Sequence, residues 1–281
     1  MNDILEINGL CKKYQSFTLS DIDISLPEGC IMGFMGENGS GKTTTIKAVL
    51  GLIKTDAGSI RLFGRPMDRK SLDDVGFVLD SCPFPELMNA VQVGKMMSSF
   101  YSRWDGELYK AYLKKFSVDA KKDVGKLSQG NKTKLSIAAA LSHHPRLLIL
   151  DEPTNGLDPV ARDLFLGILM DFIQDEKNSV FMSSHITGDL EKICDYIAFI
   201  YNGKIKLTGQ KDQILERYGI LHCGKEAFKS IDPSAVYANR TNRFGVDALV
   251  NRKRLRGDYT VDPATLEEIM LFTINGQETE L

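Results

Sequence analysis

Short apolar runs alternate with longer amphipathic stretches along most of the chain. Residues 4–26 show β-type alternation, as at Ile22, Ile24 and Leu26, whereas the run 147–150 is continuously apolar. Alternation is typical of half-buried strands, and a short continuous run suits a strand buried on both faces of a parallel sheet. Further strands are expected at 30–35, 59–63, 75–79 and 179–183, and helices at 43–50, 87–101, 108–116, 132–141 and 163–174. Strands that alternate with helices predict an α/β fold with a mostly parallel sheet.

The pattern changes towards the C-terminus. Apolar strands at 196–201 and 204–208 flank Asn202-Gly203, which is a strong signal for a two-residue hairpin. Beyond about Gln213 the periodicity weakens. We therefore expect a main domain of residues 1–212 and a small C-terminal extension of residues 213–281.

The clearest element of this extension is a helix near its end. Asp262 is expected as the N-cap and Pro263 at the first helical position, where a missing N–H group costs nothing. Leu266, Ile269 and Met270 would then lie on one side of the helix.

Net charge and cysteine usage narrow the possible functions. The 281 residues carry a net charge of −2, so no general basic field points to nucleic acid as a partner. The densest basic cluster is interpreted as a solvated face or a partner contact; it comprises Arg252, Lys253, Arg254 and Arg256. Five scattered cysteines without CxxC spacing argue against a disulfide framework or a zinc site and fit a reducing cytosol.

No segment is typical of a membrane anchor or a secretory signal. No run approaches the ~20 apolar residues of a membrane-spanning helix, and no apolar run follows a basic N-terminus. If the protein serves a membrane, we expect it to do so as a peripheral subunit.

A glycine-rich segment between the strand at 30–35 and the helix at 43–50 matches the pattern GxxxxGK[ST]. Glycines let consecutive backbone N–H groups turn towards phosphate oxygens, and the following helix points its positive end at the same anion. We expect Lys42 to reach the β- and γ-phosphates, and the Thr43 hydroxyl to bind Mg²⁺. A plain glycine turn is disfavoured by the strand–loop–helix context. The predicted nucleotide-binding residues are Gly36, Glu37, Asn38, Gly39, Ser40, Gly41, Lys42, Thr43 and Thr44.

Two acidic residues follow the apolar run at 147–150. A nucleoside triphosphatase of this type needs a carboxylate near Mg²⁺ at the end of a neighbouring strand. Asp151 is expected to hold the metal, directly or through water, and Glu152 to polarise the attacking water as general base. Taken alone, the pair could simply end a strand in solvent; the phosphate loop upstream favours the catalytic interpretation.

With these motifs in order, residues 1–212 resemble the ABC ATPase family. The segment 127–131, Leu-Ser-Gln-Gly-Asn, is similar to the family signature, which usually reads LSGGQ. The resemblance implies a P-loop NTPase core with an antiparallel β subdomain and a helical signature subdomain, and it implies ATP as the nucleotide. It also implies that Ser128 and Gly130 contact the γ-phosphate of ATP held by a partner subunit. From the residues alone, Ser128 could equally be an ordinary helix cap.

Three further residues gain a role from the same resemblance. Asp158, in 155–158, resembles the D-loop aspartate that communicates across the dimer. His185 resembles the switch histidine that contacts the γ-phosphate, although a lone histidine after a strand is usually structural. Tyr14 stands where the family stacks an aromatic ring on adenine; the alternative is an ordinary surface or core tyrosine.

The chain departs from the family pattern at two places. Asp80 occupies the position of the Q-loop glutamine, and the signature has Gln129 for glycine and Asn131 for glutamine. Aspartate still offers oxygen to Mg²⁺, so Asp80 is a predicted metal contact, but it adds negative charge and has a shorter reach. The predicted contacts of Ser128 and Gly130 do not depend on the altered positions.

The resemblance implies an ATPase whose two chains pair around two ATP molecules, as a homodimer or with a second ABC ATPase. Such a dimer would lie in the cytoplasm on the inner face of the cell membrane, beneath an integral membrane permease. The short tail containing 266–270 is similar to bacterial export-type members and favours export.

The alternative function is that of a soluble ABC ATPase acting on ribosomes or DNA. Ribosomal members resemble two cassettes in one chain, and DNA-repair members carry a long coiled-coil insertion. This chain has one cassette, and residues 43–127 lack sustained heptads. A non-hydrolytic binding module is disfavoured by the presence of Glu152.

Overall fold

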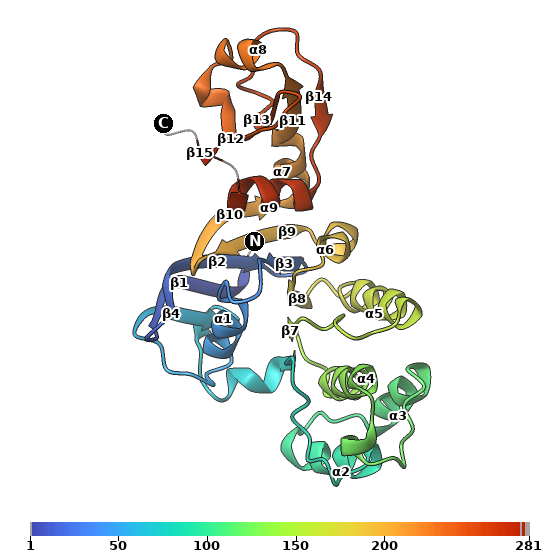
Figure 1. Ribbon diagram of the computed structural model, residues 1–281. Coiled ribbons are helices and arrows are strands. Elements are labelled where there is room, and N and C mark those ends of the chain that lie inside the picture. The colour runs from blue at the N-terminus through green and yellow to red at the C-terminus, as the bar shows by residue number, and fades with distance from the viewer. Residues whose placement is uncertain (1, 276, 279–281) are drawn as a thin grey trace.

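A six-stranded, mostly parallel sheet forms the centre of the computed structural model, which describes residues 2–275, 277 and 278 (Figure 1). Its strand order is β10-β9-β3-β8-β7-β6; all neighbours run parallel except β10, which pairs antiparallel with β9. The continuous apolar runs explain the arrangement, because every residue of β3, β7 and β8 is buried. The predicted α/β class is confirmed. The strands are β3 (Ile31–Met35), β6 (Val75–Val78), β7 (Leu147–Asp151), β8 (Ser179–Ser184), β9 (Tyr196–Tyr201) and β10 (Lys204–Gln210).

A four-stranded antiparallel sheet packs against one face of the central sheet. Its buried side chains share one apolar cluster with α1 (Lys42–Val49), and the alternation at Ile22, Ile24 and Leu26 points these residues into that cluster. The strand order is β2-β1-β4-β5. The strands are β1 (Asp3–Lys13), β2 (Thr18–Pro27), β4 (Ala57–Leu62) and β5 (Arg65–Pro66).

Helices α2 (Ala90–Phe100), α3 (Gly106–Lys115) and α4 (Gln129–Leu141) form a group at the end of the molecule away from the C-terminal extension (Figure 1). Asn89 and Gln92 form a capping box, so α2 begins later than its apolar pattern suggested. A short 3₁₀ helix, η1 (Ser71–Asp74), precedes β6, and a second, η2 (Val124–Lys126), precedes α4.

Two helices on the same face of the sheet as α4 differ from expectation. Helix α5 (Pro159–Phe172) begins with Asp158 as N-cap and proline at its first position, four residues before the expected start at 163. Helix α6 (Thr187–Ile193) was not predicted; it follows β8 directly and is only seven residues long.

The C-terminal extension contains a sheet that the weak sequence pattern did not predict. Its five antiparallel strands have the order β14-β11-β13-β12-β15. The hairpin predicted upstream is confirmed, since Asn202 and Gly203 both have positive φ between β9 and β10. The elements are α7 (Lys211–Arg217), β11 (Tyr218–Cys223), α8 (Lys225–Lys229), η3 (Pro233–Ala235), β12 (Val236–Thr241), β13 (Val246–Asn251), β14 (Val261–Pro263), α9 (Leu266–Asn275) and β15 (Gln277–Glu278).

The expected cap of the last helix was wrong. Asp262 and Pro263 lie in β14, which pairs with β11, and the helix starts at Leu266. Thr265 and Glu268 cap it instead: the Glu268 N–H donates to Thr265 Oγ1 (3.2 Å), and the Thr265 N–H donates to Glu268 Oε2 (2.8 Å). The sequence contains the Thr265 and Glu268 capping pair. Because Asp262 and Pro263 pair with β11, the helix starts later than predicted, at Leu266.

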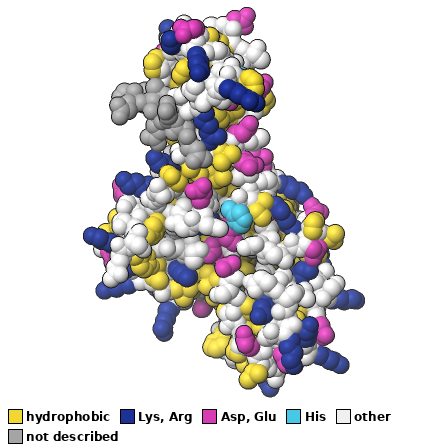
Figure 2. Space-filling view, in the orientation of Figure 1, with side chains coloured by type: hydrophobic (Ala, Val, Ile, Leu, Met, Phe, Trp, Pro, Cys, Tyr) yellow, Lys and Arg dark blue, Asp and Glu magenta, His cyan; other side chains and the backbone are white. Residues whose placement is uncertain are grey.

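Helix α9 joins the extension to the central sheet. It lies between the extension's strands and β9–β10 (Figure 1), and its buried side chains share an apolar cluster with Leu190 and Ile193 of α6. The Leu266 N–H donates to Glu191 Oε1 at 2.6 Å, so a side chain of α6 satisfies a free donor at the start of α9. In the space-filling view the extension forms a lobe above the main body (Figure 2).

Candidate functional site

The glycine-rich loop crosses from β3 to α1 in a shape that requires its glycines. A Cβ on Gly36 would lie 2.4 Å from the Ile200 carbonyl oxygen, and Gly41 has a φ of 118°. The Lys42 side chain is buried and donates from Nζ to the carbonyl oxygens of Gly36 (2.6 Å) and Glu37 (3.1 Å). The loop thus forms a cradle with its lysine folded back across it.

Asp151 is held rigidly at the end of β7. Its carboxylate is buried and accepts hydrogen bonds from Thr43 Oγ1 (2.7 Å) and Ser183 Oγ (2.6 Å). Because parallel strands end at the same edge of a sheet, β3, β7 and β8 bring these three residues together. Ser183 was predicted only as the last residue of a strand, and its contact with Asp151 was not predicted.

Glu152 has an unusual backbone conformation for a non-glycine residue, with φ of 50°. Such strain costs of order 1–3 kcal/mol and is often found at functional sites. Its Oε1 lies 3.1 Å from Lys42 Nζ. Its Oε2 accepts the His185 N–H (3.2 Å) and lies 2.8 Å from His185 Nδ1. The turn therefore places one carboxylate between the lysine and the histidine.

A cavity of about 660 Å³ opens over these groups. It brings most of the predicted residues together, and Asp80 lies on its wall. It also includes Ser16, Phe17 and Asn155, which the sequence analysis did not assign. The sequence-predicted residues that line it are Glu37, Asn38, Gly39, Gly41, Lys42, Thr43, Thr44, Asp80, Glu152 and His185.

Tyr14 is not among the residues lining this cavity. The residue is 42% exposed, and the centroid of its ring lies 5.6 Å from Lys12 Nζ. Tyr14 and Phe17 belong to the same turn, since the Tyr14 N–H donates to the Phe17 carbonyl oxygen at 2.8 Å. The sequence signal for Phe17 was that it is an aromatic residue only three positions after Tyr14.

Ser128, Gly130 and Asp158 also lie outside the cavity. Ser128 caps α4 by accepting the Asn131 N–H (3.3 Å), and its contact with a phosphate of the other chain stays a prediction. Asp158 caps α5 by accepting the Ala161 N–H (2.9 Å), and this hydrogen bond lowers the pKa of its carboxyl group. A Cβ on Gly130 would lie 2.6 Å from the Gly156 carbonyl oxygen, so the signature and D-loop segments pack closely.

The donor set around Asp151 fits a magnesium ion that enters with a nucleotide. Among the described residues, no group of three or more histidine, cysteine, aspartate or glutamate side chains could hold a metal alone. Mg²⁺ prefers oxygen ligands and is usually held by one or two carboxylates together with substrate phosphates. The Thr43 hydroxyl and the Asp151 carboxylate supply such oxygens beside the phosphate loop.

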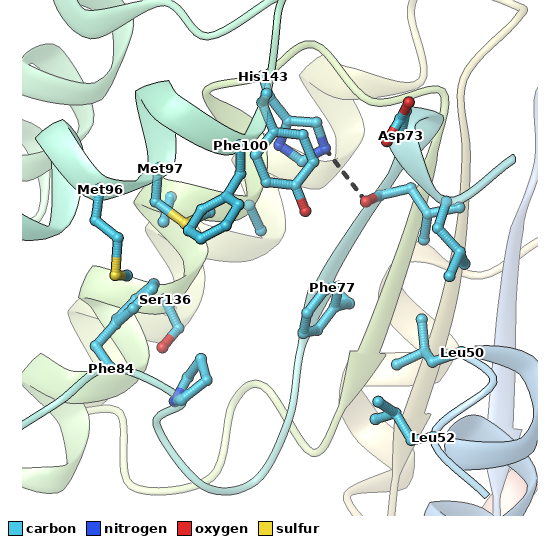
Figure 3. Close-up of a pocket in the computed structure, with 16 residues that line it drawn as sticks. Leu50, Leu52, Asp73, Phe77, Phe84, Met96, Met97, Phe100, Ser136 and His143 are labelled. Carbon is cyan, nitrogen blue, oxygen red and sulfur yellow. Dashed lines mark hydrogen bonds between the residues drawn. The ribbon is translucent and has the colours of Figure 1, made fainter. Parts of the chain in front are cut away.

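A second cavity, of about 490 Å³, is a largely apolar groove between α1, β6, α2 and α4 (Figure 3). Met96, Met97 and Phe100 face Leu50 and Leu52 across it, and Leu52 and Phe100 are exposed. Buried His143 lines it, and its Nε2–H group donates to the Val75 carbonyl oxygen (3.2 Å). Burial lowers the pKa of His143 to about 4.

No helix in the described part of the chain combines the length and apolarity needed to cross a bilayer.

Comparison with known proteins gives these features a context. A model of the ABC transporter family matches residues 19–155. The lantibiotic transport ATP-binding protein SrtF of Streptococcus pyogenes is 34% identical over 212 residues, which span 74% of this chain and 92% of that protein. The bacitracin transport ATP-binding protein BcrA of Bacillus licheniformis is 35% identical over 211 residues, spanning 73% and 69% of the two chains. A dimeric ATP-binding cassette solved in a post-hydrolysis state with ADP and phosphate shares the fold, with a TM-score of 0.66 and 20% identity; the match covers 73% of this chain and 98% of that one.

Proposed function

The chain belongs to the ABC transporter ATP-binding family, and from this premise we propose that it hydrolyses ATP in a dimer to drive export through a separate membrane subunit. The observation that supports the catalytic part is the convergence of Lys42, Thr43, Glu152 and His185 on one cavity, with buried Asp151 beneath them. The geometry suits phosphoryl transfer, which depends on positioning and charge neutralisation more than on covalent chemistry.

Each of these residues has a role that its position supports. Lys42 already lies inside the loop and can exchange its carbonyl contacts for phosphate oxygens. Thr43 and Asp151 would hold Mg²⁺, which when bound neutralises charge on the β- and γ-phosphates. Asp80 lies on the same cavity wall, where its carboxylate can contact the metal, directly or through water.

Glu152 is the proposed general base. Its Oε1 is buried and pairs with Lys42 Nζ at 3.1 Å, so a phosphate that attracts Lys42 would free this oxygen for a water molecule. His185, held by Oε2 of the same carboxylate, would contact the γ-phosphate. A positioned carboxylate that removes a proton from water contributes about 10²–10⁴ to the rate.

The dimer is proposed because Ser128, Gly130 and Asp158, which are predicted to contact nucleotide, do not line this cavity. Ser128 and Asp158 are exposed at the starts of α4 and α5, where helix N-termini attract anions. In the proposed dimer, Ser128 and Gly130 contact ATP bound to the other chain, which is a second copy or another ABC ATPase, and Asp158 lies at the interface. Tyr14, exposed beside the cavity mouth residues Ser16 and Phe17, would stack on adenine.

The mass of the protein in solution tests this arrangement. Glu152→Gln keeps the size of the side chain but removes its basicity, so ATP should stay bound and the dimer should accumulate. We expect the mass to shift towards two chains in ATP with Mg²⁺, but not in ADP. Glu176→Gln, at an exposed glutamate, is the control and should behave like the wild type. A variant that remains monomeric even with its membrane partner would contradict the scheme.

The membrane partner is proposed to be an integral permease, with this chain bound peripherally to the cytoplasmic face. Because no described helix can span a bilayer, transport requires a second protein. The groove in Figure 3 suits a short apolar-faced segment of that permease: its walls are methionine and aromatic side chains, and Leu52 and Phe100 are exposed at it. The names of SrtF and BcrA support a transport role. The cargo would be selected by the permease.

We also propose that residues 1–212 are the nucleotide-binding domain and residues 213–281 a docked extension. The boundary falls in α7, directly before the five-stranded sheet begins at Tyr218. Contacts between α9 and α6, including the bond from Leu266 to Glu191, would hold the two parts together.

A further inference from the structure

Two positions at which this chain departs from the family pattern lie next to each other. Gln129 stands where the signature usually has glycine, and Asp80 stands where the Q-loop usually has glutamine. The Gln129 Nε2 group donates to the backbone carbonyl oxygen of Asp80 at 3.2 Å. The first turn of α4 is thereby tied to the loop that follows β6.

Gln129 touches a third segment as well. A Cβ built on Gly156 would lie 3.6 Å from Gln129 Cγ, so the side chain packs beside the D-loop glycine. Gln129, Asp80 and Gly156 line a small cavity of about 70 Å³ together with Asp151 and Glu152. The glutamine is therefore seated between the loop on the wall of the nucleotide cavity and the segment that leads into α5.

We propose that Gln129 is a positioning residue for ATP hydrolysis. Its carboxamide couples the Asp80 loop, which faces the nucleotide of its own chain, to the Ser128–Gly130 turn, which faces the nucleotide of the other chain. The part of this inference that concerns the nucleotide of the other chain rests on the proposed function. A movement of the Asp80 loop at one nucleotide would then reach the Ser128–Gly130 turn at the other nucleotide. It would do so through the Gln129–Asp80 hydrogen bond and the packing of Gln129 beside Gly156.

The chemistry of the site favours a neutral donor at this position. Asp80, Asp151 and Glu152 already place three carboxylates around the small cavity. The side-chain amide of glutamine can donate to the Asp80 carbonyl oxygen without adding negative charge, whereas glycine has no side-chain donor. Glutamate at position 129 would lose the donor and add a fourth carboxylate, which like-charge repulsion disfavours.

The first experiment compares Gln129→Ala with wild type in the full chain. Without nucleotide, we expect faster hydrogen exchange of the amides around Asp80 in the variant, because the loop loses its tie to α4. With Mg²⁺, the affinity for a non-hydrolysable ATP analogue should stay unchanged. The value of kcat should fall by about three- to tenfold, the range expected for the loss of one hydrogen bond.

Three further variants separate positioning from general damage. Gln129→Glu should lower kcat further than Gln129→Ala, and Gln129→Lys, which keeps an N–H donor, should recover most of the rate. Gln174→Ala is the matched control, because Gln174 Nε2 also donates to a backbone carbonyl oxygen at 3.2 Å, that of Met170 in α5. It should leave exchange around Asp80 and kcat unchanged.

An unchanged kcat in Gln129→Ala would overturn the inference, whatever the exchange shows. A loss of analogue affinity equal to the loss of rate would also overturn it, because it would indicate a binding role. These results differ from a failure of the proposed function, in which the wild type itself would show no Mg²⁺-dependent hydrolysis.

Discussion

Lys42 and Glu152 form an ion pair of 3.1 Å between the phosphate loop and the end of β7, with side chains only 5% and 11% exposed. The pair neutralises both charges where a triphosphate is proposed to bind. A phosphate that attracts Lys42 would compete with Glu152 and release its carboxylate towards water. The same movement would therefore fill the cradle and free the base.

Glu152→Gln tests the kinetic side of this relationship. The amide cannot accept a proton from water, and it no longer pairs electrostatically with Lys42. We expect kcat to fall by about 10²–10⁴, the usual contribution of a general base, while ATP affinity stays equal or increases. Steady-state hydrolysis and equilibrium ATP binding measure the two effects. A variant with wild-type kcat would remove Glu152 from the proposed chemistry.

Ser183→Ala tests the support of the metal ligand. The Ser183 hydroxyl donates to Asp151 Oδ1 at 2.6 Å, so its loss leaves one oxygen of a buried carboxylate without a partner. Loss of such outer-shell partners typically lowers metal affinity by about 10- to 100-fold. We expect the Mg²⁺ concentration for half-maximal hydrolysis to rise by this factor. Ser179→Ala, at the other end of β8, controls for loss of a buried hydroxyl and should leave Mg²⁺ dependence unaltered.

Phe100→Asp tests the groove. A charge on this exposed ring position would oppose docking of an apolar segment, because the carboxylate would lose its hydration. We expect less co-purification with the membrane subunit and unchanged ATP affinity. Phe244→Asp replaces another exposed phenylalanine, in the extension and outside the groove, and should co-purify normally. Equal behaviour of the two variants would argue against the groove as the permease contact.

His143 should make stability depend on pH. Burial lowers its pKa from 6.5 to about 4, so between these values the unfolded chain binds more protons than the folded one. Stability should therefore rise with pH across this window and be lost as pH falls through it, by up to about 3 kcal/mol. Thermal unfolding of wild type and His143→Gln from pH 4.5 to 6.5 measures the slope. It should become shallower in His143→Gln and persist in His144→Gln, whose ring is exposed.

The features predictable from sequence were those set by local chemistry. The run 147–150 is apolar throughout, so its burial in a parallel sheet followed directly, and the phosphate loop was specified by its glycines and Lys42. The hairpin at Asn202-Gly203 was also local, since both residues adopt positive φ. For these elements the backbone conformation depends mainly on the residues themselves.

The features that escaped prediction depend on contacts between distant segments. Helix α6 is too short to show a helical period, and the extension's sheet depends on the pairing of β11 with β13 and β14, which are not its neighbours in sequence. The contacts of Ser183 with Asp151 and of Gln129 with Asp80 arise only once β7, β8 and α4 are placed together. Sequence motifs identified the site residues, but not these supporting contacts.

The central claim is that the loop around Lys42 binds ATP together with Mg²⁺. Equilibrium binding of ATP with and without Mg²⁺ tests it most directly, in wild type, Lys42→Ala and Lys47→Ala; Lys47 is an exposed lysine of the same helix. We predict Mg²⁺-dependent binding in wild type and Lys47→Ala, and an affinity at least about 100-fold lower in Lys42→Ala, which loses a buried charged contact to phosphate. Undiminished binding by Lys42→Ala, or no effect of Mg²⁺ on the wild type, would contradict the account.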